Sequence, residues 1–224
     1  MSAQNGVAFF DVDETLVSVR TLESFLLFYL KRVPSMISIE RLGALREQVV
    51  RLSRADFNRL YFRIWAGQPE AEVLQAGRDW FAEAVGHPDF YRPNVLQRLR
   101  QHRDNGARVV LVSGSFAAPL RPLGDALAVD ALYCTELEVV DGVYTGEISA
   151  AMIDDDKRRA VDAYLATIGD DAVSWAYGDH PSDLPLLERV TTPVVVGDDP
   201  ELGVIASERG WSVMDVDRPL APRA

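Results

Sequence analysis

The chain has 224 residues, of which 48% are hydrophobic and 25% are charged, and its formal net charge is −11. This balance indicates a globular protein built as one domain with an insertion or as two small domains. The acidic charge argues against DNA or RNA as a partner, because a polyanion is bound by a basic surface, but it leaves a small anionic substrate possible.

The features that bear on location favour the cytoplasm. Cys134 is the single cysteine, so no internal disulfide can form, which fits a reducing compartment. The first ten residues (MSAQNGVAFF) lack the basic start and the apolar core of a signal peptide. The most apolar stretch, residues 25–30 (FLLFYL), is too short to span a bilayer. We therefore expect a cytoplasmic protein without membrane contact.

The first predicted element is a buried strand at residues 7–10 (VAFF), which ends abruptly in acidic residues. Residues 21–85 are helical in pattern throughout and predict three or four amphipathic helices that form a small bundle over the strand tips. Their apolar faces, which are expected to be core, are Ile39, Leu42, Leu45, Val49 and Leu52, then Phe57, Leu60, Tyr61, Ile64 and Trp65, then Val73, Leu74, Gly77, Trp80, Phe81 and Ala84.

From residue 95 the chain alternates between helices and strands, which predicts an α/β fold with a parallel sheet. Helices are predicted at residues 95–103 and 157–168. Strands are predicted at residues 108–112 (RVVLV), 131–134 (ALYC), 173–177 (VSWAY) and 193–196 (PVVV). Residues 135–148 alternate in hydrophobicity and contain Asp-Gly, which predicts a β-hairpin. The Pro-rich tail from Arg218 is expected to fray.

The first chemical motif is Asp11-Val12-Asp13-Glu14-Thr15, directly after the first strand. In extended backbone, residues two apart point the same way, so Asp11 and Asp13 would share one face at the sheet edge. Two such carboxylates repel each other, and their pKa values move apart unless a cation holds both ionised. The pair suits an ionised nucleophile and a proton donor, although a metal or turn site without catalysis remains an alternative.

Two further motifs are suited to anions. Ser113-Gly114-Ser115 follows the RVVLV run, where a hydroxyl and outward-facing backbone N–H groups can hold phosphate oxygens; ordinary turn composition is the alternative. Lys157 opens a predicted helix after the acidic triplet 154–156 and could neutralise a phosphoryl group. The alternative for Lys157 is a solvated lysine on the protein surface.

The fourth motif is Gly178-Asp179-His180-Pro181-Ser182-Asp183, after the VSWAY run. Asp179 and Asp183 can supply oxygen ligands to a hard cation such as Mg²⁺. His180 is a candidate for the pocket wall and a weaker candidate for a catalytic base. Zinc is disfavoured, because it prefers a cluster of His and Cys ligands, and the other two histidines, His87 and His102, lie in unrelated segments.

Taken together and in this order, the motifs resemble the haloacid dehalogenase-like (HAD) hydrolase superfamily. The helical insertion and the text of residues 136–148 are similar to its phosphoserine-phosphatase-like subgroup, subfamily IB. The resemblance covers residues 7–200 and implies a Rossmann-like parallel sheet flanked by helices, with an inserted helical-bundle cap of the C1 type. It implies a core domain of residues 1–16 and 88–224 and a cap domain of residues 17–87.

The resemblance also implies roles for the motif residues. Asp11 would attack phosphorus and form an aspartyl-phosphate, and Asp13 would act as the acid and then the base. The implied phosphate-binding residues are Thr15, Ser113, Gly114 and Lys157, with Thr15 orienting Asp13 or steadying the turn. The implied Mg²⁺ ligands are Asp11, the backbone carbonyl of Asp13, Asp179 and Asp183, the last directly or through water.

Substrate specificity is expected to depend on Arg20, Arg63 and His180. Phosphoserine phosphatases usually carry a glutamate nine residues after the nucleophile, which meets the ammonium group of the substrate, whereas this chain has Arg20 there. Their last motif reads Gly-Asp-Gly-x-Asn-Asp, whereas this chain has His180 and Ser182. An arginine prefers a carboxylate, a second phosphate or hydroxyl-rich groups, so phosphoserine is expected to be a poor substrate. Arg63, beside Tyr61 and Trp65, could add a cap contact, although core packing and a solvated arginine are the simpler interpretation.

The expected function is Mg²⁺-dependent hydrolysis of a small phosphorylated metabolite. Asp13 favours a phosphate ester over a halide, because a halide leaves without a proton. Phosphonate cleavage would need a Schiff-base lysine in the cap, where Lys31 is the single lysine. Two non-enzymatic alternatives remain: a catalytically silent metal-binding scaffold, and a phospho-receiver module, which is shorter and lacks the helical insertion.

Overall fold

A seven-stranded sheet runs through the computed structural model, with the strand order β4-β3-β2-β1-β5-β6-β7. The structure describes residues 6–32, 54–169 and 172–216. The strands are β1 (Gly6–Phe10), β2 (Arg108–Phe116), β3 (Ala131–Val140), β4 (Val143–Ala150), β5 (Val173–Gly178), β6 (Thr192–Val196) and β7 (Ser212–Met214). Neighbouring strands pair in parallel, except β3 and β4, which are antiparallel. The predicted α/β fold with a mostly parallel sheet is confirmed.

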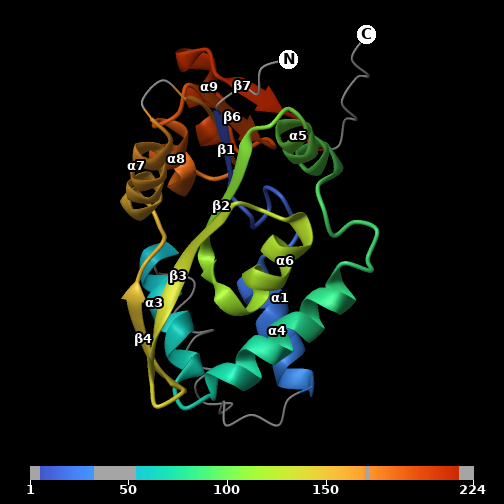
Figure 1. Cartoon of the computed structure of the whole chain (residues 1–224), viewed down its shortest axis with the longest axis vertical. Helices are drawn as coiled ribbons and strands as arrows, with labels where there is room; N and C mark the ends of the chain where they lie inside the picture. Colours follow the sequence, from blue (N-terminus) through green and yellow to red (C-terminus); the bar gives the residue numbers. More distant parts are fainter. Residues whose placement is uncertain (1–5, 33–53, 170–171, 217–224) are drawn as a thin grey trace.

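Helices cover both faces of this sheet (Figure 1). They are α1 (Thr21–Arg32), α3 (Arg54–Phe62), the 3-10 helix η2 (Arg63–Trp65), α4 (Glu70–Ala84), α5 (Pro93–Asp104), α6 (Ala117–Leu127), α7 (Asp155–Ile168), the 3-10 helix η3 (Pro181–Asp183), α8 (Leu184–Leu187) and α9 (Pro200–Arg209). Alternate side chains of β1 point to opposite faces. Ala8 and Phe10 belong to a core shared with α5 and α6, whereas Val7 and Phe9 belong to a core shared with α7, α8 and α9. Among the described helices, none has the length and apolar character needed to cross a bilayer.

The strand register brings the ends of β1 and β5 beside the middle of β2, at one edge of the sheet. Phe10, the last residue of β1, pairs with Leu111 of β2 and with Tyr177 of β5. All five residues of β1 are buried, as expected for a central parallel strand covered on both faces. The polar residues that follow Phe10 and Tyr177 in sequence therefore emerge side by side.

The helices α1, α3 and α4 lie together with the β3–β4 hairpin in the lower half of Figure 1. Aromatic side chains join them to the end of β2: the ring of Trp65 in η2 lies 5.3 Å from that of Phe25 in α1 and 5.3 Å from that of Phe116. Tyr61 and Trp80 are also buried, as the helical patterns predicted. The predicted face of Ile39, Leu42, Leu45, Val49 and Leu52 and the tail from Arg218 lie outside the described residues.

Two strands are longer than predicted. The predicted hairpin at residues 135–148 is confirmed, but its first arm is continuous with the predicted strand at 131–134 in the single strand β3. The first half of β3 pairs with β2 and the second half with β4, so partners on opposite edges extend it. Likewise β2 does not end before Ser113, as predicted, but continues to Phe116 through an irregularity in its pairing with β3.

The contact between α4 and α6 depends on a residue without a side chain. A Cβ on Gly77 in α4 would lie 2.0 Å from the backbone oxygen of Ala118 in α6. We expect Gly77→Ala to lower the free energy of unfolding by about 3 kcal/mol, because the two helices would have to move apart. Urea denaturation measures the change.

A second glycine offers the matched control. Gly203 lies inside α9 and has no atom within 4 Å of a built Cβ. Gly203→Ala is expected to raise the free energy of unfolding by about 0.5–1 kcal/mol, since alanine loses less entropy in a helix. Equal changes for the two variants would contradict the proposed close approach of α4 and α6.

Candidate active site

Segments far apart in sequence bring polar side chains to the edge where β1 and β5 end beside β2. Asp11 follows β1, Ser113 lies in β2, Lys157 lies in the first turn of α7, and Asp179 follows β5. A cavity of about 310 Å³ lies at this edge. It is lined by Asp11, Asp13, Arg20, Leu22, Glu23, Phe57, Asn58, Ser113, Gly114, Ser115, Ile153, Lys157, His180 and Ser182. All four sequence motifs therefore contribute residues to one cavity.

Lys157 is a buried cation at the floor of this cavity. Its Nζ donates hydrogen bonds to Asp11 Oδ1 at 2.6 Å and to Asp183 Oδ1 at 2.5 Å. Lys157 is only 3% exposed, which excludes the alternative of a solvated lysine. A buried ammonium is retained only when it is paired and hydrogen-bonded, and the two carboxylates meet that condition.

The charges around Asp11 do not balance. Burial raises the pKa of Asp11 well above 3.8, Asp183 and Asp179 raise it further, and Lys157 lowers it. Burial alone would lower the pKa of Lys157, but the charges of Asp11 and Asp183 outweigh it and the pKa is raised. Asp11 is therefore repelled by the carboxylates of the last motif.

The arrangement of carboxylates fits a hard divalent cation. Asp11, Asp179 and Asp183 each offer an oxygen, and these oxygens lie within 4.8 Å of one another. Thr15 donates its hydroxyl hydrogen bond to Asp179 Oδ1 at 2.7 Å, so the structure places Thr15 beside this cluster. Oxygen ligands are those that Mg²⁺ prefers, and the surplus negative charge favours its binding.

The turn after β5 is held in one conformation by local hydrogen bonds. Asp183 Oδ2 accepts from the backbone N–H groups of Asp179 and His180, each at 3.2 Å. Gly178 permits the close approach of Asp183, because a Cβ on Gly178 would lie 2.6 Å from the Cβ of that residue. His180 accepts at Nδ1 from the backbone N–H of Ser182 at 3.1 Å and lines the cavity. The structure thus places His180 in the cavity wall.

Asp13 is held by the first residue of α1. Its Oδ1 accepts from the backbone N–H of Thr21 at 3.2 Å and from the Thr21 hydroxyl at 2.7 Å. The Thr21 hydroxyl also lies 2.8 Å from Ser115 Oγ. Asp13 therefore satisfies an N–H at the start of α1, where a helix has N–H groups without an internal partner.

The two arginines named from sequence occupy different places. Arg20 lines the cavity and donates from Nε to Glu14 Oε2 at 2.8 Å. Glu14 has a positive φ of 61°, an uncommon conformation in the turn between Asp13 and Thr15. Arg63 is not part of the cavity lining; it pairs with Glu147 of β4 at 3.7 Å, and its side chain is 64% exposed.

Several lining residues had no functional signal in the sequence. Glu23 and Asn58 are single polar positions within helical patterns, and Phe57 falls on a predicted apolar core face. Asn58 is buried and its Nδ2 donates to the Gly114 carbonyl at 3.4 Å. A polar residue on an amphipathic helix lines a cavity only if the packing of the helix turns that residue toward it. Thr21 was likewise missed, although its position as a helix start was a usable signal.

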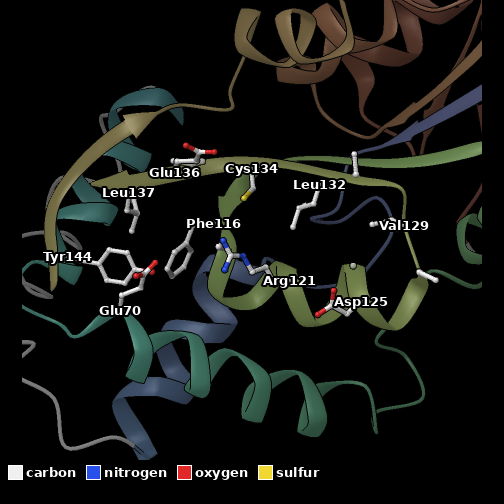
Figure 2. A pocket seen from close by; sticks show the side chains of 15 residues that line it. Glu70, Phe116, Arg121, Asp125, Val129, Leu132, Cys134, Glu136, Leu137 and Tyr144 are labelled. Carbon is white, nitrogen blue, oxygen red and sulfur yellow. The ribbon is translucent and has the colours of Figure 1, made fainter. Parts of the chain in front are cut away.

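A second cavity, of about 790 Å³, lies between α6 and the β3–β4 hairpin (Figure 2). Its lining shares no residue with the Asp11 cavity. Figure 2 shows Arg121 and Asp125 on α6 facing Cys134 and Leu132 on β3. Burial raises the pKa of Cys134 to about 11, so its thiol stays protonated at neutral pH and is a poor nucleophile. The larger cavity is therefore not the centre of the acid–base chemistry.

The chain is similar in sequence to known hydrolases. A family model described as haloacid dehalogenase-like hydrolase matches residues 8–188. A histidinol-phosphatase of Neisseria meningitidis is 25% identical over 93% of this chain and 98% of its own length. A phosphoserine phosphatase of Halobacterium salinarum is 29% identical over 88% of this chain and 87% of its own length.

The fold is also similar to that of solved structures. A protein of unknown function from Bordetella pertussis superposes with a TM-score of 0.79 at 27% identity, over 94% of this chain and 98% of its own. The match extends over nearly the whole of both chains.

Proposed function

Because the chain belongs to the haloacid dehalogenase-like hydrolase family, we propose that it is a Mg²⁺-dependent phosphatase that hydrolyses the monoester of a small metabolite. The observation that carries the proposal is the buried group of Asp11, Lys157 and Asp183 at the floor of the cavity. A carboxylate held against an ammonium group and facing a cavity is suited to attack a phosphoryl group. The phosphatase names of two relatives support this reaction class.

Asp11, Asp179 and Asp183, whose oxygens lie within 4.8 Å of one another, would hold Mg²⁺. The family resemblance adds the backbone carbonyl of Asp13. When bound, Mg²⁺ supplies positive charge that offsets the repulsion between an anionic ester and these carboxylates. Thr15 orients Asp179 through its 2.7 Å hydrogen bond. We propose that Thr15 acts on the phosphoryl group only indirectly, through Asp179.

In the first half of the reaction, an Asp11 carboxylate oxygen attacks phosphorus and the bond from phosphorus to the ester oxygen breaks. The leaving oxygen keeps the bonding electron pair and takes a proton from Asp13. The Lys157 ammonium, the Ser113 hydroxyl and the Gly114 backbone N–H bind the phosphoryl oxygens and stabilise the charge that develops on them. The product is an alcohol and an aspartyl-phosphate at Asp11.

In the second half, Asp13 is a carboxylate and takes a proton from water. The water oxygen attacks phosphorus, and the bond between phosphorus and the Asp11 oxygen breaks. Inorganic phosphate leaves, Asp11 is again ionised and Asp13 is again protonated. Asp13 thus makes the intermediate short-lived, which distinguishes this proposal from a phospho-receiver module.

The cavity volume of about 310 Å³ suits a small metabolite rather than a macromolecule. Arg20 stands where phosphoserine phosphatases are expected to carry a glutamate, so we propose that phosphoserine is not the preferred substrate. Phosphoserine as the best ester of a panel would contradict this. The cytoplasm is the proposed location, in keeping with the single cysteine.

The test is phosphate release from p-nitrophenyl phosphate and from sugar, amino-acid, polyol, nucleotide and histidinol phosphates. We expect release with Mg²⁺ and its loss with EDTA. A scaffold would bind Mg²⁺ without hydrolysing any ester, and a receiver module would accumulate a stable phospho-aspartate. Either outcome would contradict the proposed phosphatase.

Thr21 is expected to be a positioning residue for Asp13. Thr21→Val keeps the shape and the backbone N–H bond but removes the hydroxyl that lies 2.7 Å from Asp13 Oδ1. We expect kcat for p-nitrophenyl phosphate to fall about tenfold with a smaller change in KM, because a hydrogen bond to a charged group is worth about 1.5–3 kcal/mol. Steady-state kinetics at saturating Mg²⁺ measures it.

The conservative variant Thr21→Ser is the control. It restores a hydroxyl at the same position and is expected to recover most of kcat. A Thr21→Ser variant as slow as Thr21→Val would show that packing of the methyl group, rather than the hydrogen bond, is what matters. Normal kcat in both variants would exclude the positioning role.

A further inference from the structure

The cavity has a chemically distinct outer wall above its phosphoryl-binding floor. The floor holds Asp11, Ser113 and Lys157, which follow or belong to the core elements. The outer wall is defined here as Arg20, Leu22, Glu23, Phe57 and Asn58. Arg20 directly precedes α1, Leu22 and Glu23 lie in its first turn, and Phe57 and Asn58 lie in α3. When the phosphoryl group is bound at the floor, the leaving group of the substrate faces this wall.

The two cations of the cavity lining are already paired. Lys157 lies between Asp11 and Asp183 at the floor. Arg20, on the outer wall, is paired with Glu14 at 2.8 Å. Arg20 stands where phosphoserine phosphatases usually carry a glutamate. Its positive charge is largely cancelled by Glu14.

Glu23 is the charge left over on the outer wall. Its side chain is exposed and lines the cavity, and none of the residues described by the structure forms an ion pair with it. Arg20 and Glu14 cancel, so the group of Arg20, Glu14 and Glu23 carries one net negative charge. The apolar surfaces of Leu22 and Phe57 lie on the same wall.

Resting on the proposed function, we infer that the outer wall selects a phosphomonoester whose leaving group carries a cationic amine on a short apolar skeleton, and that the Glu23 carboxylate binds the amine. A primary amine is protonated at neutral pH and donates hydrogen bonds to a carboxylate. The carbon chain between the ester oxygen and the amine would pack on Leu22 and Phe57.

The outer wall is expected to bind an anionic leaving group less well than a cationic one. A carboxylate or second phosphate would have to draw Arg20 away from Glu14 while approaching Glu23. The Arg20–Glu14 pair is exposed, with side chains 61% and 37% exposed, and such a pair is weak. Arg20 could therefore move, but the Glu23 charge would remain beside the incoming anion.

The experiment compares three small esters that differ in one charge: O-phosphoethanolamine, ethyl phosphate and phosphoglycolate. We expect the full chain with Mg²⁺ to hydrolyse O-phosphoethanolamine with a kcat/KM at least about tenfold above that for ethyl phosphate, because a hydrogen bond to a charged group is worth about that factor. Phosphoglycolate is expected to be the poorest. In Glu23→Gln the ratio for amine over neutral ester should fall about tenfold, mainly through KM.

Glu72→Gln is the matched control, since Glu72 is an exposed acid on α4 that does not line the cavity. It makes the same change in net charge and should leave the ratio at the wild-type value. A preference for phosphoglycolate, or equal ratios in Glu23→Gln and Glu72→Gln, would overturn the inference while leaving the phosphatase intact.

Failure of the proposed function gives a different result. If no ester were hydrolysed, the binding of O-phosphoethanolamine and ethyl phosphate to the Mg²⁺-loaded protein would still be measured by calorimetry. Tighter binding of the amine that is lost in Glu23→Gln would support the inference without the chemistry. Equal binding of the two esters would overturn it.

Discussion

Asp11→Asn is expected to lower kcat for Mg²⁺-dependent phosphate release by about 10⁴-fold or more, the loss seen when a nucleophile is removed. Asparagine has nearly the shape of aspartate, but its neutral amide oxygen is a poor nucleophile. The substitution also removes one negative charge from the group of three carboxylates that fits a divalent cation. Phosphate release from p-nitrophenyl phosphate measures the loss.

The control for this variant is Asp79→Asn, because Asp79 is an exposed aspartate on α4 that does not line the cavity. We expect its kcat to be unchanged. Retention of activity in Asp11→Asn would contradict the aspartyl-phosphate mechanism and favour a nucleophile elsewhere.

The stability of the metal-free protein provides an independent check on Asp11. Burial and the charge of Asp183 raise the pKa of Asp11 in the folded state, so between the unfolded and folded pKa values the folded state holds more protons. The contribution of this group to stability is therefore full below the unfolded pKa and is lost as pH rises through the folded pKa. Asp11→Asn should raise the free energy of unfolding in EDTA at pH 7 by about 0.5–2 kcal/mol, and less at pH 4. Thermal denaturation measures this change. If Asp11→Asn proved less stable than the wild type, its lost activity would be explained by misfolding instead.

Lys157→Met is expected to have the largest effect on stability. Methionine fills a similar volume but leaves Asp11 and Asp183 buried without the ammonium group that lies 2.6 Å and 2.5 Å from them. Breaking a buried ion group in this way costs about 3–5 kcal/mol. We expect the free energy of unfolding at pH 7 to fall by that amount. The loss should shrink at lower pH, because burial raises the pKa of Asp11 and this carboxyl group then takes up a proton.

The chain contains only one other lysine, Lys31, which is exposed at the end of α1. Lys31→Met therefore makes the same chemical change at a solvated position and should alter stability by less than about 0.5 kcal/mol. Activity should be lost in Lys157→Met and kept in Lys31→Met. Similar urea midpoints for the two variants would exclude the buried ion group.

Local patterns in the sequence were sufficient to predict most of the fold. The apolar run before Asp11 is a central strand buried at every position, and a strand covered on both faces tends to be apolar throughout. The run before Asp179 is its neighbour β5, although Ser174 in it is polar and Val173 is exposed. The Asp141-Gly142 turn has φ values of 50° and 76°, which two-residue hairpins require and which Asp-Gly supplies. The length of β3 was not predictable, because it depends on β2 and β4 lying along its two edges.

The candidate site was also predictable only in part. The residue types and their order predicted Asp11, Ser113, Lys157 and Asp179 at one sheet edge, since the ends of parallel strands meet there. The contacts among them were decided only by the tertiary structure. Lys157 is 146 residues from Asp11, and Thr15 is 164 residues from the Asp179 that it orients. No periodicity or spacing links positions so far apart.

The sequence by itself therefore determined the sheet, the family resemblance and the chemical types of the residues at its edge, because each of these is specified by short segments. The tertiary structure decided which charges remain free to act. Arg20 is a cation by sequence, but its pairing with Glu14 leaves Glu23 as the surplus charge on the cavity wall. Lys157 could have been a surface lysine, and only burial against Asp11 and Asp183 makes it part of the site. The sequence gives the charge of each residue. Whether that charge is neutralised depends on the neighbours that folding brings within a few ångströms.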